Sequence, residues 1–446
     1  MPAQTRAIHF CHLNNRGAGM KLGTGLGFCR TGAAGPVFQN TFAVQKTEPF
    51  DGSALDTSYW SAQQPARVTV SGGNVSLTAT AAGYLDNNVY ATSALSTADT
   101  LVSVDVPAGV SQEALGLVAR RDASGNSYLV GLTVSAGIRT YRLTQPSTSS
   151  PLDIAWTTPH NLFSSGGTLE MYAVGASPTR IITVIKNTAG KVMAVQTMTD
   201  STAGYQTAGS VGFAGWTTGP AVLSNARIYT RQSTSQGPIK TLKIGDSLTE
   251  GYLTSGGAAR TVAQEDTAMA NITGLTFNTQ IQGVGGTTTT DWLPGTGNLN
   301  TAISTANANS VEVISVWLGT NDCNGILLTP VATYLSNLQS ICAALFANVP
   351  TLKSIILNGP PWHGAVSANR SATTLALAQT YCAQLPTICT GFNGRGILLG
   401  DVSSIDYFAN KTTLYNSDQV HLNDSGAVRC GLIHALTTAK VLGLIP

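Results

Sequence analysis

The chain has 446 residues, and a guideline of one domain per ~150 residues predicts two or three domains rather than a single core. Hydrophobic residues make up 43%, enough for packed cores, whereas charged residues make up only 10%, which is unlike a typical cytosolic enzyme and common in extracellular and virion proteins. The net charge is +2 with no Lys/Arg run, and no apolar run reaches the ~18 residues that span a bilayer, so nucleic acid and membrane are disfavoured as partners.

Residues 1–45 are rich in glycine and only weakly periodic, which predicts an arm for anchoring or assembly. They lack the continuous apolar segment of ~7–15 residues that marks a secretory signal peptide. A composition typical of exported proteins, without a visible leader, suggests a phage or prophage structural protein. Such a protein assembles in the cytosol and is released by lysis. A different export route, or a replaced leader, would also fit. We therefore expect a virion tail or fibre location, or an extracellular one.

Residues 46–232 predict an all-β sandwich. ARVTVSGGNVSLTAT alternates apolar and polar residues on both sides of Gly72-Gly73, which indicates a hairpin, and similar turns follow at 124–126, 135–137 and 187–190. The order of hairpins resembles the concanavalin-like jelly rolls attached to carbohydrate-active enzymes, which implies glycan binding or a structural role. Its aromatic residues suit a sugar platform, but core packing is the more common role of Trp60, Trp156 and Trp216.

A polar linker at 233–240 precedes a different pattern at 241–446, where short apolar strands alternate with amphipathic helices. We expect strands at 241–246, 275–284, 311–319, 352–360 and 396–401, and helices at 258–274, 297–309, 329–349, 368–385 and 425–443. This order predicts a doubly wound α/β domain with a parallel five-stranded sheet, whose active site lies beyond the carboxyl ends of the strands.

Those strand ends carry the residue types that acyl transfer needs. Ser247 follows the first strand, and a serine hydroxyl needs an adjacent base, which His421 supplies with Asp418 to orient it. An oxyanion needs preorganised donors, for which the candidates are the backbone N–H groups of Ser247 and Gly286 and the side-chain amide of Asn321.

The four blocks GDSLTEG, GVGGTTT, GTND and DQVHLN occur in this order between 245 and 423, and residues 241–446 resemble the SGNH, or GDSL, hydrolase family. The resemblance implies ester hydrolysis by Ser247, His421 and Asp418 without metal or cofactor. It implies an oxyanion hole from Ser247, Gly286 and Asn321, although Gly283 or Gly285 could take the place of Gly286.

Several other residues near these blocks have two interpretations. Asp246 is more typical of a structural turn than of an acid. Trp362 and His363 follow the fourth strand and are candidates for lining the substrate, with a catalytic role for His363 less favoured. Trp292 is either a cover over the site or loop packing. Two residues, Trp317 and His434, fit the core or the surface of a helix better than the site.

The seven cysteines form no CxxC pair, so a zinc site is not expected. Buried free thiols are the favoured interpretation, with a Cys382–Cys389 disulfide as the alternative.

We expect a serine esterase that removes O-acetyl groups from a bacterial surface polysaccharide, with the arm contacting other virion proteins. Because fibre-like proteins are often trimers, a homo-oligomer is one further expectation. Two alternatives remain open at this point: a lipase or thioesterase of the same family, and a non-enzymatic virion or adhesin protein with a glycan-binding sandwich.

Overall fold

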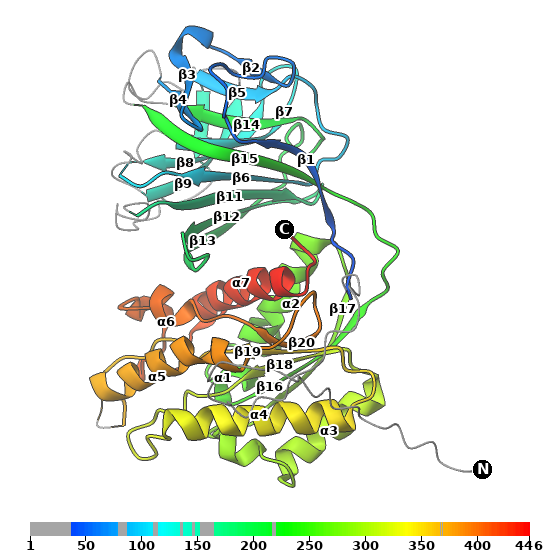
Figure 1. Cartoon of the computed structure of the whole chain (residues 1–446), viewed down its shortest axis with the longest axis vertical. Coiled ribbons are helices and arrows are strands. Elements are labelled where there is room, and N and C mark those ends of the chain that lie inside the picture. The colour runs from blue at the N-terminus through cyan, green and yellow to red at the C-terminus, as the bar shows by residue number, and fades with distance from the viewer. Residues whose placement is uncertain are drawn as a thin grey trace, which may run out of the picture. The chain divides into compact units, whose positions relative to one another are not determined.

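The computed structural model describes residues 37–78, 87–109, 115–133, 137–144, 148–151, 165–215, 220–365, 367 and 369–446 (Figure 1). The predictions for the first 36 residues, including Cys11 and Cys29, lie outside this range, as do those for Trp156 and Trp216. None of the helices in the described part of the chain has the length and apolarity needed to cross a membrane.

Two antiparallel sheets form the predicted sandwich. In one, the strands lie in the order β13 (Val192–Asp200), β12 (Thr179–Asn187), β11 (Gly167–Val174), β6 (Thr100–Val106), β15 (Ala221–Arg231), β4 (Asn74–Leu77) and β3 (Val68–Ser71), with β1 (Phe42–Glu48) also paired to β15. In the other, the order is β10 (Thr148–Pro151), β9 (Gly137–Thr144), β8 (Ser127–Thr133), β7 (Leu115–Arg121), β14 (Ser210–Gly215), β5 (Asn87–Ala91) and β2 (Trp60–Ala62).

Alternating side chains explain how the sandwich packs. In β6, Val102 and Val104 enter the core between the sheets, and Ser103 and Asp105, which alternate with them, project from the opposite face. The predicted hairpin at Gly72-Gly73 is confirmed, because Ser71 of β3 pairs with Asn74 of β4. Trp60 is buried in this core, so it packs rather than forming a sugar platform.

The second half of the chain forms the predicted five-stranded parallel sheet, confirmed in the order β17 (Phe277–Gly283), β16 (Ile239–Gly245), β18 (Val313–Trp317), β19 (Ser354–Asn358) and β20 (Gly396–Leu399). The helices are α1 (Ser247–Glu250), α2 (Thr261–Thr273), α3 (Gly297–Asn309), α4 (Val331–Asn348), α5 (Ala372–Gln384), α6 (Ser404–Tyr407) and α7 (Asp424–Val441). Short 3₁₀ turns lie at Pro65–Arg67, Gly257–Ala259, Thr289–Trp292, Leu385–Ile388 and Thr412–Leu414.

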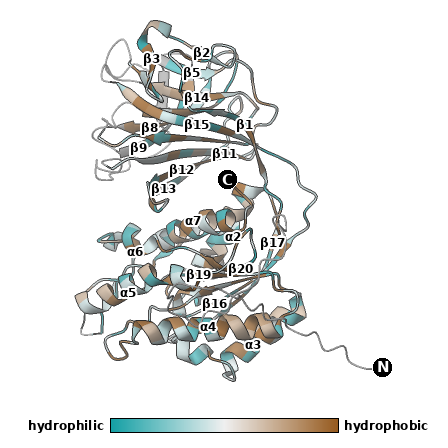
Figure 2. Cartoon of the chain, viewed as in Figure 1, coloured by the Kyte–Doolittle hydropathy of each residue, from teal (hydrophilic) through white to brown (hydrophobic). Residues whose placement is uncertain are grey.

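Helices cover both faces of this parallel sheet. Helices α2 and α7 pack against each other on one face, and α3 and α4 lie on the other (Figure 1). Figure 2 shows hydrophobic and hydrophilic segments side by side along α4, as expected for a helix with one face on a core and one in solvent. Sandwiched in this way, strands such as β18 are buried along their whole length.

Two predicted boundaries differ from the observed ones. Strand β1 begins at Phe42, inside the stretch predicted as an arm, and β16 begins at Ile239, inside the predicted linker. Residues 37–446 form one compact unit, which contains both the sandwich and the parallel sheet. Strand β12 shows the reason. Its Ile181 and Ile185 enter the sandwich core, whereas Ile182 and Val184 join the apolar cluster of the α/β half.

Candidate active site

The nucleophile candidate sits on a tight turn from strand to helix. Ser247 is the first residue of α1, directly after β16, and Asp246 caps this helix by accepting a hydrogen bond from the Leu248 N–H at 2.9 Å. Gly245 makes the turn possible, because a Cβ there would lie 2.2 Å from the Thr249 Oγ1. The turn therefore leaves Ser247 at the carboxyl end of β16, an inner strand of the parallel sheet.

His421 reaches Ser247 from the segment before α7. The Ser247 Oγ and His421 Nε2 are 2.8 Å apart, and the His421 Nδ1 lies 2.6 Å from the Asp418 Oδ2. Burial alone would raise the pKa of Asp418, but hydrogen bonds from the His421 ring and from the backbone N–H groups of Val420 and His421 outweigh it and lower that pKa. Asp418 is therefore ionised and holds the imidazole with a nitrogen facing the hydroxyl.

Gly286 and Asn321 lie beside each other at the next strand ends. Gly286 has a φ of 76° in a turn that the Thr287 N–H closes on the Val284 carbonyl, and the Asn321 Nδ2 donates to the Thr287 carbonyl at 3.0 Å. Within the described part of the chain, the backbone N–H groups of Ser247 and Gly286 have no acceptor. They are free to donate to an oxyanion.

The other two glycines of this block serve packing. A Cβ on Gly283 would lie 2.1 Å from the backbone nitrogen of Glu250, so this glycine lets α1 approach β17. A Cβ on Gly285 would lie 2.9 Å from the Glu250 Oε2. A Cβ on Gly286 would meet nothing within 4 Å, so only its positive φ requires glycine, and its surroundings leave room for a substrate.

Two supporting residues were not predicted from the sequence. Asp322 is buried and accepts hydrogen bonds from the backbone N–H and the hydroxyl of Thr289, which ties the Asn321 loop to the Gly286 loop. Arg370 donates to the Thr320 carbonyl at 2.6 Å and lies 3.5 Å from the Asn321 Oδ1. Asp322 stands in the GTND block, but nothing in the sequence around Arg370 points to Asn321.

The side chains predicted to line the substrate are buried and expose almost no surface to solvent. Trp292 is 0% exposed and donates from Nε1 to the Thr287 Oγ1. Trp362 packs against Tyr415, and His363 is 1% exposed, near Cys323 and Thr374. A role for these side chains in lining the substrate stays a prediction.

Tyr252, unlike those residues, is exposed beside the catalytic groups. Tyr252 is 54% exposed, and its ring lies edge-on to the His421 ring, with 4.9 Å between centroids. The sequence signal was present, since Tyr252 follows the GDSLTEG block, but position in sequence alone does not show that the ring faces the base.

His434 is in the core, in line with the prediction. It lies between Glu265 and Asp401, 3.7 and 3.6 Å away, and Lys243 pairs with Glu265 at 2.6 Å. Within the described residues, no group of His, Cys, Asp and Glu has an arrangement that would hold a metal ion. The five described cysteines are free thiols, and Cys389 is the one that is not fully buried.

A family model of GDSL-like lipases and acylhydrolases matches residues 244–429. These residues are a GDSL-like lipase/acylhydrolase domain. All four sequence blocks lie inside the matched range, so the chain carries an ester hydrolase domain of this type. The β-rich residues before it are not covered by that model, and no curated protein matches the chain.

Solved structures with similar backbones include a Clostridium thermocellum family 3 carbohydrate esterase, at 18% identity and a TM-score of 0.36, which covers 46% of this chain and 97% of that one. An M. smegmatis aryl esterase has 15% identity and a TM-score of 0.33, covering 46% and 99%. A Bacillus subtilis protein has 14% identity and a TM-score of 0.30, covering 88% and 92%.

Proposed function

We propose that the GDSL-like domain removes O-acetyl groups from a bacterial surface polysaccharide, with Ser247 as the nucleophile. The observation that carries the chemistry is the continuous chain of hydrogen bonds from Ser247 through His421 to Asp418, at 2.8 and 2.6 Å. The same order of hydroxyl, imidazole and carboxylate activates serine in unrelated hydrolases.

The geometry gives each group one task. The Ser247 Oγ attacks the ester carbonyl while the His421 Nε2 takes its proton, and Asp418 stabilises the imidazolium that forms. The tetrahedral oxyanion accepts hydrogen bonds from the Ser247 and Gly286 N–H groups and the Asn321 amide. Collapse breaks the bond between the carbonyl carbon and the sugar oxygen, and His421 gives its proton to that oxygen, so the sugar leaves as an alcohol. Water, deprotonated by His421, then attacks the acyl-enzyme and releases acetate.

The exposed ring of Tyr252 supports a sugar substrate. It stands beside the base, where the alcohol part of the ester leaves, and aromatic faces and edges pack well against the apolar C–H groups of a pyranose. A sugar leaving group would therefore contact Tyr252 as it takes the proton from His421.

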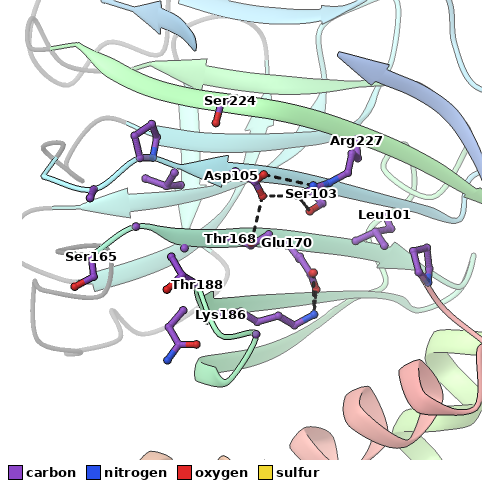
Figure 3. A pocket seen from close by; sticks show the side chains of 18 of the residues that line it. Leu101, Ser103, Asp105, Ser165, Thr168, Glu170, Lys186, Thr188, Ser224 and Arg227 are labelled. Carbon is purple, nitrogen blue, oxygen red and sulfur yellow. Dashed lines mark hydrogen bonds and ion pairs between the residues drawn. The ribbon is translucent and has the colours of Figure 1, made fainter. Parts of the chain in front are cut away.

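A pocket on the sandwich supports a second contact with the same polysaccharide. It has a volume of about 680 Å³ and is lined by residues of β6, β11, β12 and β15, many of them polar, together with Lys440 and Pro446 (Figure 3). Asp105 lies at its centre, paired with Arg227 and accepting from Thr168 at 3.2 Å, and Lys186 pairs with Glu170 at 2.8 Å. Such fixed donors and acceptors suit sugar hydroxyls.

Release of acetate tests the substrate. Purified capsule or O-antigen is incubated with the parent protein and with the Ser247→Ala variant, and free acetate is measured. We expect acetate from the parent alone. Activity on long-chain esters with no acetate from any acetylated glycan would contradict the proposal.

Glycan retention tests the pocket. In the Ser247→Ala background, which leaves acetyl groups in place, Asp105→Ala should weaken retardation in affinity electrophoresis through the same polysaccharide. Asp56→Ala is the matched control, since Asp56 is a partly exposed aspartate paired with Lys46 outside the pocket. Equal retardation of all three proteins would exclude the pocket as a glycan site.

One observation favours the alternative of a longer acyl group. Ile326, Leu327 and Leu328 are all exposed in the loop that follows Asn321. An exposed apolar loop beside an oxyanion hole suits an alkyl chain. Replacing Ile326 by Ser would then lower kcat/KM for octanoyl but not acetyl esters of p-nitrophenol, whereas an acetylesterase would show the same small change for both.

We further propose that the protein acts as part of a phage tail or fibre, with its N-terminal residues contacting other virion proteins. The low charge content supports this location. Capsid and tail genes on either side of the coding gene would agree with it, and the genes of a secretion system there would overturn it.

A further inference from the structure

Arg370 is a buried cation that forms no salt bridge with a carboxylate of the described residues. It is 7% exposed, yet no ion pair joins it to an acid within the described residues. Buried arginines are rare unless their charge is paired, because the guanidinium loses its hydration. Its contacts are instead the Thr320 carbonyl at 2.6 Å, the Asn321 Oδ1 at 3.5 Å and the Cys323 sulfur at 3.9 Å. All three belong to the loop that carries the oxyanion amide.

The segment that carries Arg370 is attached to the same loop. The Asn369 carbonyl accepts from the Gly325 N–H at 3.0 Å, and Arg370 forms a backbone bridge with Ser367. The guanidinium is therefore anchored by its backbone on one side of the Asn321 loop and by the Thr320 carbonyl on the other. This leaves it little freedom to move away from Asn321.

The charge decides which way the Asn321 amide faces. The two ends of a carboxamide have nearly the same shape, so packing alone does not fix its orientation. A guanidinium has only donors, and it repels the Nδ2 end and attracts Oδ1. With Oδ1 held toward Arg370, Nδ2 points to the Thr287 carbonyl, which accepts one of its two hydrogens at 3.0 Å. The second hydrogen remains for the oxyanion.

We propose that Arg370 is a positioning residue that holds the Asn321 amide with its N–H toward the oxyanion and strengthens that N–H as a donor by polarising the carbonyl end. Arg370 itself touches neither the substrate nor Ser247. This inference rests on the proposed ester hydrolysis at Ser247, and it assigns the buried charge of Arg370 to the orientation of one amide.

A double-mutant cycle on p-nitrophenyl acetate tests this role. Arg370→Met should lower kcat about tenfold to hundredfold with little change in KM, since removal of an oxyanion donor costs about 10²–10³ in kcat. Asn321→Ala should cost at least as much. The variant with both changes should be no slower than Asn321→Ala, because Arg370 acts through that amide.

Other results would overturn the proposal. Multiplying losses in the double variant would show that Arg370 acts independently of Asn321, and an unchanged kcat in Arg370→Met would show that it does not act at all. If Arg370→Met does not fold, Arg370→Lys replaces it in the same cycle, with a smaller expected loss because lysine keeps the charge but not the fork of donors.

The two hypotheses fail in different ways. If Ser247→Ala and the parent hydrolyse the ester at the same rate, the proposed function is wrong. If hydrolysis depends on Ser247 but the Arg370 and Asn321 losses multiply, only the role of Arg370 is wrong. Thermal unfolding of every variant, measured beside the kinetics, separates a loss of orientation from a loss of folded protein.

Discussion

Two histidine–carboxylate clusters lie near helix α7, and they differ in what surrounds them. His421, just before the helix, contacts Asp418 on one side and the Ser247 hydroxyl on the other, and remains partly accessible. His434, within the helix, lies between Glu265 and Asp401, packs edge-on against Trp317 and is 1% exposed. The residue types are nearly the same, but only the first cluster holds an accessible nucleophile.

The electrostatics of the two clusters differ as well. At His434, burial by itself would lower the pKa, but the neighbouring Cys430, Glu265 and Asp401 outweigh it and raise the pKa well above its usual value. The imidazole is thus held charged as one member of a buried ion cluster. A general base must instead be neutral before it takes a proton. The comparison predicts that the first cluster controls rate and the second controls stability.

Ser247→Ala should have the largest effect. Removing the nucleophile of a serine triad costs about 10⁶ in kcat, so hydrolysis of p-nitrophenyl acetate should fall close to the background rate. The thermal unfolding temperature should stay near that of the parent, because among the described residues the serine side chain makes its one hydrogen bond to His421. A large drop in the unfolding temperature would contradict the expectation that the first cluster controls rate and not stability.

Asp418→Asn should follow, with kcat about 10³–10⁴ lower. An amide in place of the carboxylate favours the wrong tautomer of His421 and does not stabilise the imidazolium. A matched change in the buried cluster is Asp401→Asn, which should leave kcat within a few-fold of the parent. Steady-state kinetics of both variants at one pH make the comparison, and equal losses would contradict it.

Glu265→Gln should act on stability instead of rate. Burial alone would raise the pKa of Glu265, but Lys243 and His434 outweigh it and lower that pKa to about 2. Removing one partner of a buried ion pair costs about 3–5 kcal/mol in unfolding free energy, measurable by urea denaturation. Because the folded pKa is depressed, this stabilisation is present above the unfolded value near 4.5 and is lost as pH falls toward 2.

The kinetics of Glu265→Gln provide its control. Folded Glu265→Gln protein should retain the kcat of the parent, since Glu265 has no contact with Ser247, His421 or Asn321. A variant that is stable but slow would show that the buried cluster also positions the catalytic groups.

Asp246→Asn comes last, because its effect is on the pH dependence of stability. Burial, together with the charge of Asp322, raises the pKa of Asp246 to about 7. The capping hydrogen bond from the Leu248 N–H lowers this pKa, but by less. The folded state then keeps a proton that the unfolded state releases near pH 4, so stability falls as pH rises from about 4 to 7. In the asparagine variant, the slope of the unfolding free energy against pH should be flatter by up to about 1.4 kcal/mol per pH unit than in the parent.

The parallel sheet and its four blocks could be predicted from the sequence because both depend on local pattern. Apolar strands of four to seven residues alternate with helical repeats, and parallel strands direct their carboxyl ends to one rim. Ser247, Asn321 and His421 therefore meet wherever those strands form. The sandwich was predictable for the same reason, since its hairpin turns and alternating side chains are local features.

Features that depend on contacts distant in sequence were decided only by the tertiary structure. The approach of Arg370 to Asn321, the burial of Trp292 and Trp362, and the second apolar face of β12 all arise from how loops and sheets pack together. The sequence by itself determined which residues can carry out ester hydrolysis. The tertiary structure decided how they are oriented and what surrounds them, because orientation and burial depend on neighbours that no local pattern specifies.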